Sequence, residues 1–154
     1  MRYNFLLLFL TTLIAVALSQ DWKPCQVNIK LKNTNLYWTL GSEKSVALQK
    51  KGPKSLKLTT VPFGVTPPGV KGSGIDTFHG ESIKSNGLHK GITLSSTVRN
   101  PKQQCWHFRN EFIQPCNNLS LALTASGPGP GPCIVKLECI GSSNNRQKWV
   151  VSKV

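Results

Sequence analysis

Acidic residues are scarce in this sequence: six aspartates and glutamates stand against nineteen lysines and arginines. The formal net charge of the 154-residue chain is therefore +13 at pH 7. A field of this sign and size favours anionic partners. The alternative is that the charge only keeps the protein soluble, and composition alone does not decide between the two.

Signatures of catalysis and metal binding are also missing. The chain has three histidines, and it contains no Gly-x-Ser-x-Gly, His-Glu-x-x-His or Cys-x-x-Cys spacing. Such spacings place a nucleophile beside its base, or several ligands around one metal ion. We therefore expect a protein that is not an enzyme, with no catalytic residue, no metal and no other cofactor.

One long apolar run stands at the start of the chain. It extends from Phe5 to Leu18, follows Arg2, and leads into Ala17-Leu18-Ser19 with small residues at the −3 and −1 positions. This pattern is typical of a cleaved secretory signal peptide, and the run is shorter than the roughly 20 residues that span a bilayer. We expect residues 1–19 to be removed and residues 20–154 to form a secreted, extracellular domain without a membrane span.

All five cysteines lie in this mature part: Cys25, Cys105, Cys116, Cys133 and Cys139. An oxidising compartment favours disulfide bonds over a metal site. Because the number is odd, at most two bridges form within the chain and one thiol is left over. Cys133 and Cys139 are expected on one strand, too far apart to bond with each other.

Helical periodicity is nearly absent after residue 20. Short alternating runs such as Gln26–Leu31 are broken by Gly, Pro, Asn and Ser, as in the Pro67-Pro68-Gly69 tract. Alternation with period two indicates strands, and closely spaced short strands indicate a barrel or a sandwich. The sequence predicts an all-β fold.

A sequence pattern occurs twice in the second half of the chain, at an offset of 43 residues. The corresponding positions are Ile92 and Val135, Leu94 and Leu137, Gln104 and Gln147, Trp106 and Trp149, and Phe108 and Val151. A period of this length indicates a repeat architecture, in which each unit cannot bury its apolar face alone.

A third, weaker copy lies at the front of the mature chain. Leu36–Leu40 parallels Leu121–Ala125, and Val46 and Leu48 take the places of Ile92 and Leu94. The Gln-x-Trp signature is missing from this copy, where Leu58 would fill the tryptophan position. The chain divides into a first unit near 22–64, a second near 65–112 and a third near 113–154.

Three units of this length, two of them ending in Gln-x-Trp, resemble the ricin B-type lectin domain (carbohydrate-binding module family 13). The resemblance implies a single β-trefoil of three units of about 43 residues. It also implies a structural role for the repeated motif, in which the tryptophans join the core and the glutamines bind neighbouring backbone. These motif residues are Gln104, Trp106, Gln147 and Trp149.

In this family the sugar pocket of each unit needs an aspartate early in the unit, an aromatic residue on the next hairpin, and an Asn or Gln before Gln-x-Trp. Matched position by position, the first unit has Tyr37 and the third has Ala122 where the acid belongs. The second unit offers the candidate sugar-binding residues Asp76, His89, Asn100 and Gln103. The alternative is that Asp76 caps a turn and His89 is a solvated loop residue.

Five lysines of the first unit form a candidate anion-binding set: Lys44, Lys50, Lys51, Lys54 and Lys57. Lysines borne on turns attract polyanions without a defined pocket, although such a run is also an ordinary solvated face. Together with the resemblance, they lead us to expect a secreted, non-enzymatic, lectin-like protein that binds a glycan or acidic polysaccharide. Nucleic acid would use the same lysines but is less expected outside the cell.

The alternative function belongs to another class. A basic trefoil whose sugar pockets are degenerate would act as a protein-interaction or toxin-like factor, or as a protease inhibitor, with an extracellular protein as its partner. Asn118-Leu119-Ser120 is an N-glycosylation sequon, so Asn118 is a candidate modification site in either case.

Overall fold

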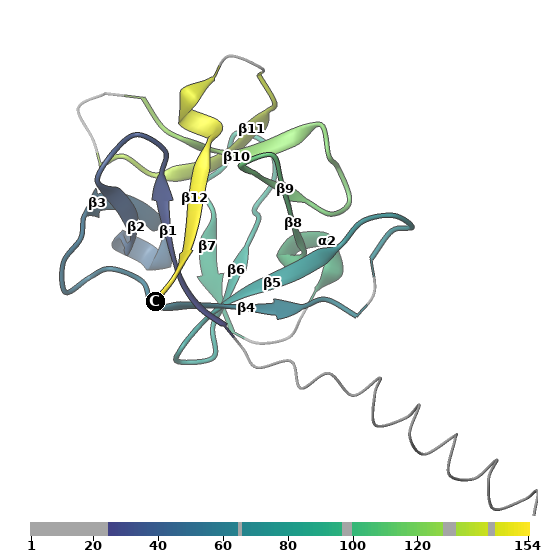
Figure 1. Ribbon diagram of the computed structural model, residues 1–154, viewed down its shortest axis with the longest axis horizontal. Helices are drawn as coiled ribbons and strands as arrows, with labels where there is room; N and C mark the ends of the chain where they lie inside the picture. Colours follow the sequence, from purple (N-terminus) through teal and green to yellow (C-terminus); the bar gives the residue numbers. More distant parts are fainter. Residues whose placement is uncertain (1–24, 65, 97–99, 128–131, 142–143) are drawn as a thin grey trace, which may run out of the picture.

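The computed structural model describes residues 25–64, 66–96, 100–127, 132–141 and 144–154 (Figure 1). The expected signal peptide, residues 1–19, lies outside this part of the chain. The described residues form short strands joined by turns, which confirms the all-β prediction. No described helix is long and apolar enough to cross a membrane.

The described residues form twelve strands with few helical turns between them. In the first half these are β1 (Cys25–Leu31), β2 (Leu36–Leu40), β3 (Val46–Lys50), β4 (Leu58–Pro62), β5 (Gly72–Thr77) and β6 (Ser82–Lys84). In the second half these are β7 (Thr93–Ser95), β8 (Trp106–Arg109), β9 (Phe112–Pro115), β10 (Leu121–Ala125), β11 (Val135–Cys139) and β12 (Trp149–Lys153). The short helical turns are η1 (Ser42–Lys44), α2 (Pro101–Gln104) and η2 (Asn145–Gln147).

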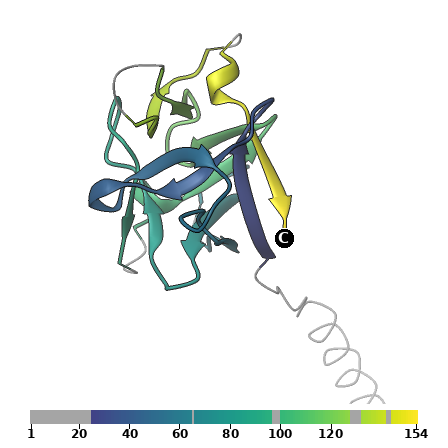
Figure 2. The ribbon, with the colours of Figure 1, turned by 90° about the vertical axis from the view of Figure 1, so that its left-hand side faces the viewer.

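The first and last strands close the structure. β1 pairs antiparallel with β12, from Val27 opposite Lys153 to Leu31 opposite Trp149, and the two strands run side by side in both views (Figures 1 and 2). β1 also pairs with β2 and with β4. β4 continues the sheet to β5, which in turn pairs with β6 and β8. The sheet therefore curls around one core.

Three hairpins place the repeated apolar residues opposite one another. Trp38 pairs with Leu48 in β2–β3, Ile83 with Leu94 in β6–β7, and Leu123 with Leu137 in β10–β11. All six of these residues are buried. Because side chains on a strand alternate between faces, this common register directs each pair into the core.

The tryptophans of the two Gln-x-Trp motifs are fixed in the same way. The indole Nε1 of Trp106 donates to the carbonyl oxygen of Ile83 at 3.1 Å, and that of Trp149 donates to the carbonyl oxygen of Leu123 at 2.8 Å. Both rings are buried. Each tryptophan thus ties the start of its strand to the hairpin of its own unit and satisfies a buried polar group.

The first unit fills its share of the core differently. Leu58 is fully buried at the position where the other units have tryptophan, and Trp38 stands on the hairpin where they have Ile83 and Leu123. The rings of Trp38 and Trp149 meet edge to face with centroids 5.6 Å apart. The aromatic volume of the first unit is therefore supplied from β2 rather than from the end of the unit.

A disulfide bond joins Cys105 to Cys116, with the Cα atoms 5.4 Å apart. It links the residue before β8 to the residue after β9, and Gly72 on β5 lies against it, where a Cβ atom would collide with the sulfur of Cys105. The expectation of a disulfide is thus confirmed. The remaining cysteines, Cys25, Cys133 and Cys139, are unpaired in the part of the chain described.

Candidate functional site

The hairpins show which residues stand at the family's acid position. In the second and third units the tryptophan indole bonds to Ile83 and Leu123, so the preceding residues, Ser82 and Ala122, correspond to each other. The shared hairpin register places Tyr37 at the same position of the first unit. None of the three side chains is a carboxylate, so the acid that binds sugar hydroxyls in ricin B-type lectins is absent from this position of all three hairpins.

The match of Asp76 with Ala122 was therefore wrong. The bonded carbonyl lies 26 residues before Trp149 but only 23 before Trp106, whereas Asp76 lies 30 residues before Trp106, on β5 and not on β6. Asp76 lies opposite Ser82 in the β5–β6 ladder and accepts a hydrogen bond from its hydroxyl at 2.5 Å. The carboxylate thus supports the turn between these strands.

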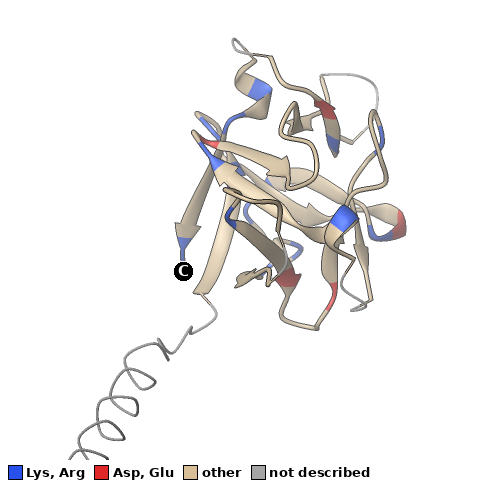
Figure 3. Ribbon diagram, turned by 90° about the vertical axis from the view of Figure 1, so that its right-hand side faces the viewer, with Lys and Arg blue, Asp and Glu red and all other residues tan. Residues whose placement is uncertain are grey.

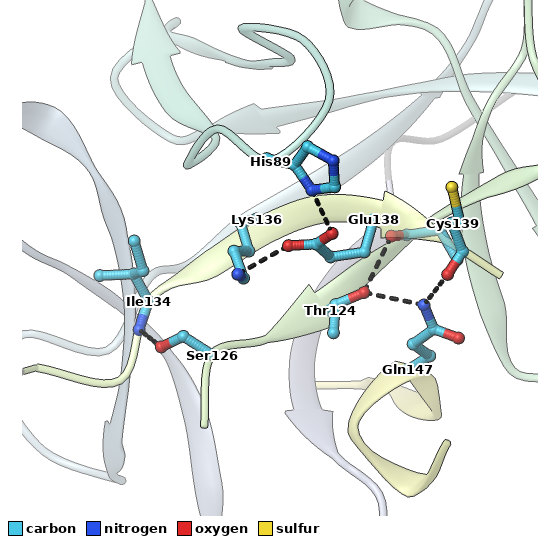
Figure 4. A network of polar contacts seen from close by, with 9 residues as sticks. His89, Thr124, Ser126, Ile134, Lys136, Glu138, Cys139 and Gln147 are labelled. Carbon is cyan, nitrogen blue, oxygen red and sulfur yellow. Dashed lines mark hydrogen bonds and ion pairs between the residues drawn. The ribbon is translucent and has the colours of Figure 1, made fainter. Parts of the chain in front are cut away.

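His89 points toward the third unit (Figure 4). Its Nδ1 lies 2.6 Å from one carboxylate oxygen of Glu138, whose other oxygen lies 2.6 Å from the Lys136 ammonium. The hydrogen bond from Lys136, aided by that of His89 and opposed by burial, holds the pKa of Glu138 below its ordinary value. The backbone N–H of His89 also donates to the carbonyl oxygen of Leu137, so His89 joins the second unit to the third.

Asn100 and Gln103 are brought together at the start of α2. The Asn100 side chain accepts a hydrogen bond from the Lys102 N–H at 3.0 Å, which caps the short helix, and donates to Gln103 at 3.4 Å. The carbonyl oxygen of Gln103 accepts from the N–H of Ser85 at 2.8 Å. Each of the four residues predicted for a sugar pocket thus has a hydrogen-bonding partner within the protein, and their role in binding sugar stays a prediction.

The glutamines of the repeated motif are buried beside these helical turns. Gln147 donates to Thr124 and to the carbonyl oxygen of Cys139 (Figure 4). It also accepts from the N–H of Gly141. Gln104 accepts from the N–H of Asn100 at 2.5 Å. Both side chains satisfy backbone groups of the loop before the tryptophan.

The lysines predicted as one anion-binding set are divided by the structure. Lys44 forms an ion pair with Glu81 at 2.8 Å, so its charge is largely compensated. Lys50 is exposed at the end of β3, and Lys54 lines a hollow beside Leu40 and Pro132. Basic positions are spread over the whole ribbon, with few acidic positions between them (Figure 3).

Lys51 and Lys57 line one shared hollow with a volume of about 350 Å³, and the Lys51 ammonium lies 5.8 Å from the centroid of the Tyr37 ring. Gln26 and Asn28 of β1 and the ring of Phe78 also line it. No ion pair among the described residues involves either lysine. We name this site, defined by Gln26, Asn28, Lys51, Lys57 and Phe78, the basic hollow.

Sequence reasoning found the two lysines of the basic hollow but missed its other members. Phe78 stands in the turn between β5 and β6, just before His79 and Gly80, and 74% of its side chain is exposed. An aromatic residue in a Gly-containing turn is the one local signal for such a site. Gln26 and Asn28 carry no signal of their own, because they reach the hollow only through the pairing of β1 with β4.

Asn118 is exposed in the turn between β9 and β10. Its side-chain oxygen accepts a hydrogen bond from the N–H of Ser120, the third residue of the sequon, at 3.0 Å. The side chain is accessible for modification, and its glycosylation stays a prediction.

Comparison of the structure with solved structures identifies the fold. The C-half of the earthworm R-type lectin in complex with GalNAc matches with a TM-score of 0.61 and 15% sequence identity, covering 85% of this chain and 100% of that one. The ricin B-type lectin fold is therefore present. No family model and no curated protein sequence matches the chain.

Two further solved structures share this β-trefoil. A mutant of the earthworm lectin C-terminal domain in complex with 6'-sialyllactose has a TM-score of 0.61 and 16% identity, covering 85% of this chain and all of that one. Cry35Ab1 has a TM-score of 0.65 and 20% identity, and the match covers 85% of this chain but 36% of Cry35Ab1. At identities of 15–20% these comparisons establish the fold alone. It is the fold that the repeated motif predicted.

Proposed function

We propose that this chain is a secreted, non-enzymatic carbohydrate-binding protein that prefers acidic glycans. The observation that carries the proposal is the basic hollow, where Lys51 and Lys57 face the same space without a carboxylate partner among the described residues. Uncompensated ammonium groups around a hollow attract carboxylate or sulfate groups, and a concave surface concentrates that attraction.

Two further observations support an acidic ligand. The family's acid positions hold Tyr37, Ser82 and Ala122, so recognition of neutral sugars through an aspartate is lost at those places. A mutant of the earthworm domain with the same fold is in complex with 6'-sialyllactose, a sugar that bears a carboxylate, and the C-half of that lectin is also in complex with the neutral sugar GalNAc. Charge-driven recognition on a trefoil scaffold is consistent with both.

A glycan array on residues 20–154 tests the proposal, with neutral, uronic-acid and sulfated ligands probed at low and high salt. We expect binding to acidic glycans that weakens with salt, because screening acts over about 8 Å at physiological ionic strength. Lys51→Glu combined with Lys57→Glu should abolish it. Lys71→Glu combined with Lys90→Glu changes the net charge equally at exposed sites outside the basic hollow and should retain most of it.

The alternative function, a basic protein-interaction factor or protease inhibitor, is favoured by the same loss of the family's acid positions. It predicts no signal on any glycan and a specific extracellular protein recovered by pull-down. If the glycan array gives no signal, and that protein still binds after the Lys51→Glu and Lys57→Glu changes, this alternative replaces the lectin proposal.

A further inference from the structure

We propose that the basic hollow binds one residue of a sugar acid, with its ring stacked on Phe78 and its carboxylate between Lys51 and Lys57. This inference rests on the proposed function and makes it specific: the ligand is recognised as a carboxylated pyranose, and charge alone does not account for its binding. It assigns Phe78 as the residue that selects a sugar over other anions.

The turn that carries Phe78 is held rigidly. The N–H of Thr77 donates to the carbonyl oxygen of Glu81 at 2.7 Å, and the N–H of Gly80 donates to that of Thr77 at 3.0 Å. The hydroxyl of Thr77 accepts from the N–H of Glu81 at 3.2 Å, and the ion pair between Lys44 and Glu81 braces the turn from η1. A preorganised backbone leaves only side-chain rotation of Phe78 to be ordered on binding.

Phe78 is the most exposed of the large aromatic side chains described, while Trp38, Trp106 and Trp149 are buried. Its ring meets that of His79 in a T-shaped contact, with centroids 5.9 Å apart, and most of its surface stays accessible to other contacts. An aromatic ring on a well-ordered turn is a common anchor in recognition sites.

The opposite wall of the basic hollow supplies polar groups. Val27 is buried, so the neighbouring residues Gln26 and Asn28 on β1 point away from the core. Their side-chain amides form no hydrogen bond with another described residue, whereas an amide can both donate to and accept from sugar hydroxyls. The volume of about 350 Å³ lies at the small end of the range for ligand sites, which suits one sugar residue.

The chemistry of a sugar acid matches these walls. One face of a pyranose ring carries mostly C–H groups and packs on an aromatic ring, while the carboxylate forms charge-assisted hydrogen bonds with ammonium groups. A neutral sugar offers the first contact without the second. A simple inorganic anion offers the second without the first. The basic hollow therefore favours a ligand that carries both groups.

The position of the basic hollow separates it from the pockets on the three hairpins. It is built from β1, the connection between β3 and β4, the β5–β6 turn and Val154. Tyr37, Ser82 and Ala122 are not among the residues that line it, although Tyr37 contacts the Lys51 ammonium from outside. Binding there also leaves the contact between His89 and Glu138 undisturbed.

The experiment titrates residues 20–154 with trigalacturonate, with the matched neutral galactose trisaccharide and with sodium sulfate, by calorimetry and NMR. We expect trigalacturonate to bind tightest and to shift the Phe78 ring resonances. Phe78→Ala should weaken its binding about fivefold to tenfold, as expected for the loss of a stacking contact. Phe78→Tyr keeps the ring and should retain most of the affinity. The melting temperature should stay unchanged, because the side chain is exposed.

Unchanged trigalacturonate affinity in Phe78→Ala, or equally tight binding of sulfate, would overturn the inference. If the Lys51→Glu and Lys57→Glu changes still abolish binding in that case, the proposed acidic-glycan function stands without the stacking site. Absence of binding to every acidic glycan tested in the unmodified protein would instead remove the proposed function itself.

Discussion

The first unit and the third unit carry out the same structural task with different residues. In the third unit, Trp149 lies at the end of the unit, is bonded to Leu123 and is supported by the buried Gln147. In the first unit, Leu58 takes that place and Trp38 enters the core from the hairpin. The comparison teaches that the trefoil requires a fixed core volume near the closing strands, while the strand that supplies it can change.

The largest expected effect tests the volume supplied by the third unit. Trp149→Ala should lower the free energy of unfolding by about 3–5 kcal/mol, because it leaves a cavity beside Trp38 and an unpartnered carbonyl at Leu123. Urea unfolding followed by circular dichroism measures it. A loss below 1 kcal/mol would show that the third unit does not depend on this ring.

The disulfide bond lies at the junction between the second and third units, and its removal measures how much this junction contributes to the stability of the fold. Replacing Cys105 and Cys116 together by alanine removes a cross-link between residues 11 apart, and should cost about 2–4 kcal/mol. Thermal unfolding of the double variant, with the reduced unmodified protein for comparison, measures the loss. Equal stability of the oxidised and reduced forms would contradict this expectation.

A smaller effect on stability is expected from the indole hydrogen bond alone, and a comparison of Trp149 with Trp38 separates it from the effect of side-chain volume. Trp149→Phe removes the donor to Leu123, whereas the indole N–H of Trp38 has no partner among the described residues. We expect Trp149→Phe to cost about 1–2 kcal/mol more than Trp38→Phe, because a buried carbonyl is left unsatisfied. Equal costs in denaturant unfolding would mean that the two rings contribute through packing alone.

The smallest effect concerns the link between the second and third units at Glu138. The pKa of this carboxyl lies below its ordinary value of 4.5, so its ionised form stabilises the fold above that pH. The stabilisation disappears as the pH falls through the lower folded-state value. Glu138→Gln should therefore cost about 0.2–1 kcal/mol at pH 7 and almost nothing at pH 2, as measured by unfolding at both pH values. If the free energies of unfolding of the two proteins differed by the same amount at both pH values, the contribution of Glu138 would not be ionic.

The core was predictable because its signals are local and periodic. Each unit has two apolar residues separated by one position, and these pairs end in Leu48, Leu94 and Leu137. In the structure each of these leucines lies opposite a buried residue of the preceding strand: Trp38, Ile83 and Leu123. The acid position was not predictable by counting. The second unit is three residues shorter than the third inside its hairpin, because the paired residues Ile83 and Leu94 are 11 positions apart whereas Leu123 and Leu137 are 14 apart. Strand pairing and the indole hydrogen bonds reveal where the shortening falls.

The basic hollow could be predicted only in part, for a different reason. A cluster of lysines in the sequence pointed to the right region, but the ion pair of Lys44 with Glu81 depends on the turn after β5. Phe78 joins Lys51 and Lys57 because β4 pairs with both β1 and β5. Contacts between distant segments of this kind follow from sheet pairing, which a single sequence does not specify.

The pairing of β1 with β12 also determines when the molecule can finish folding. Val27 pairs with Lys153, which lies 126 residues further along the chain. The backbone hydrogen bonds along this edge of β1 can therefore form only after β12 has been synthesised. Contacts of such long range slow folding, because loop closure precedes any stabilisation. During translation β1 therefore leaves the ribosome with an open edge, and the barrel closes only after Trp149–Lys153 has emerged.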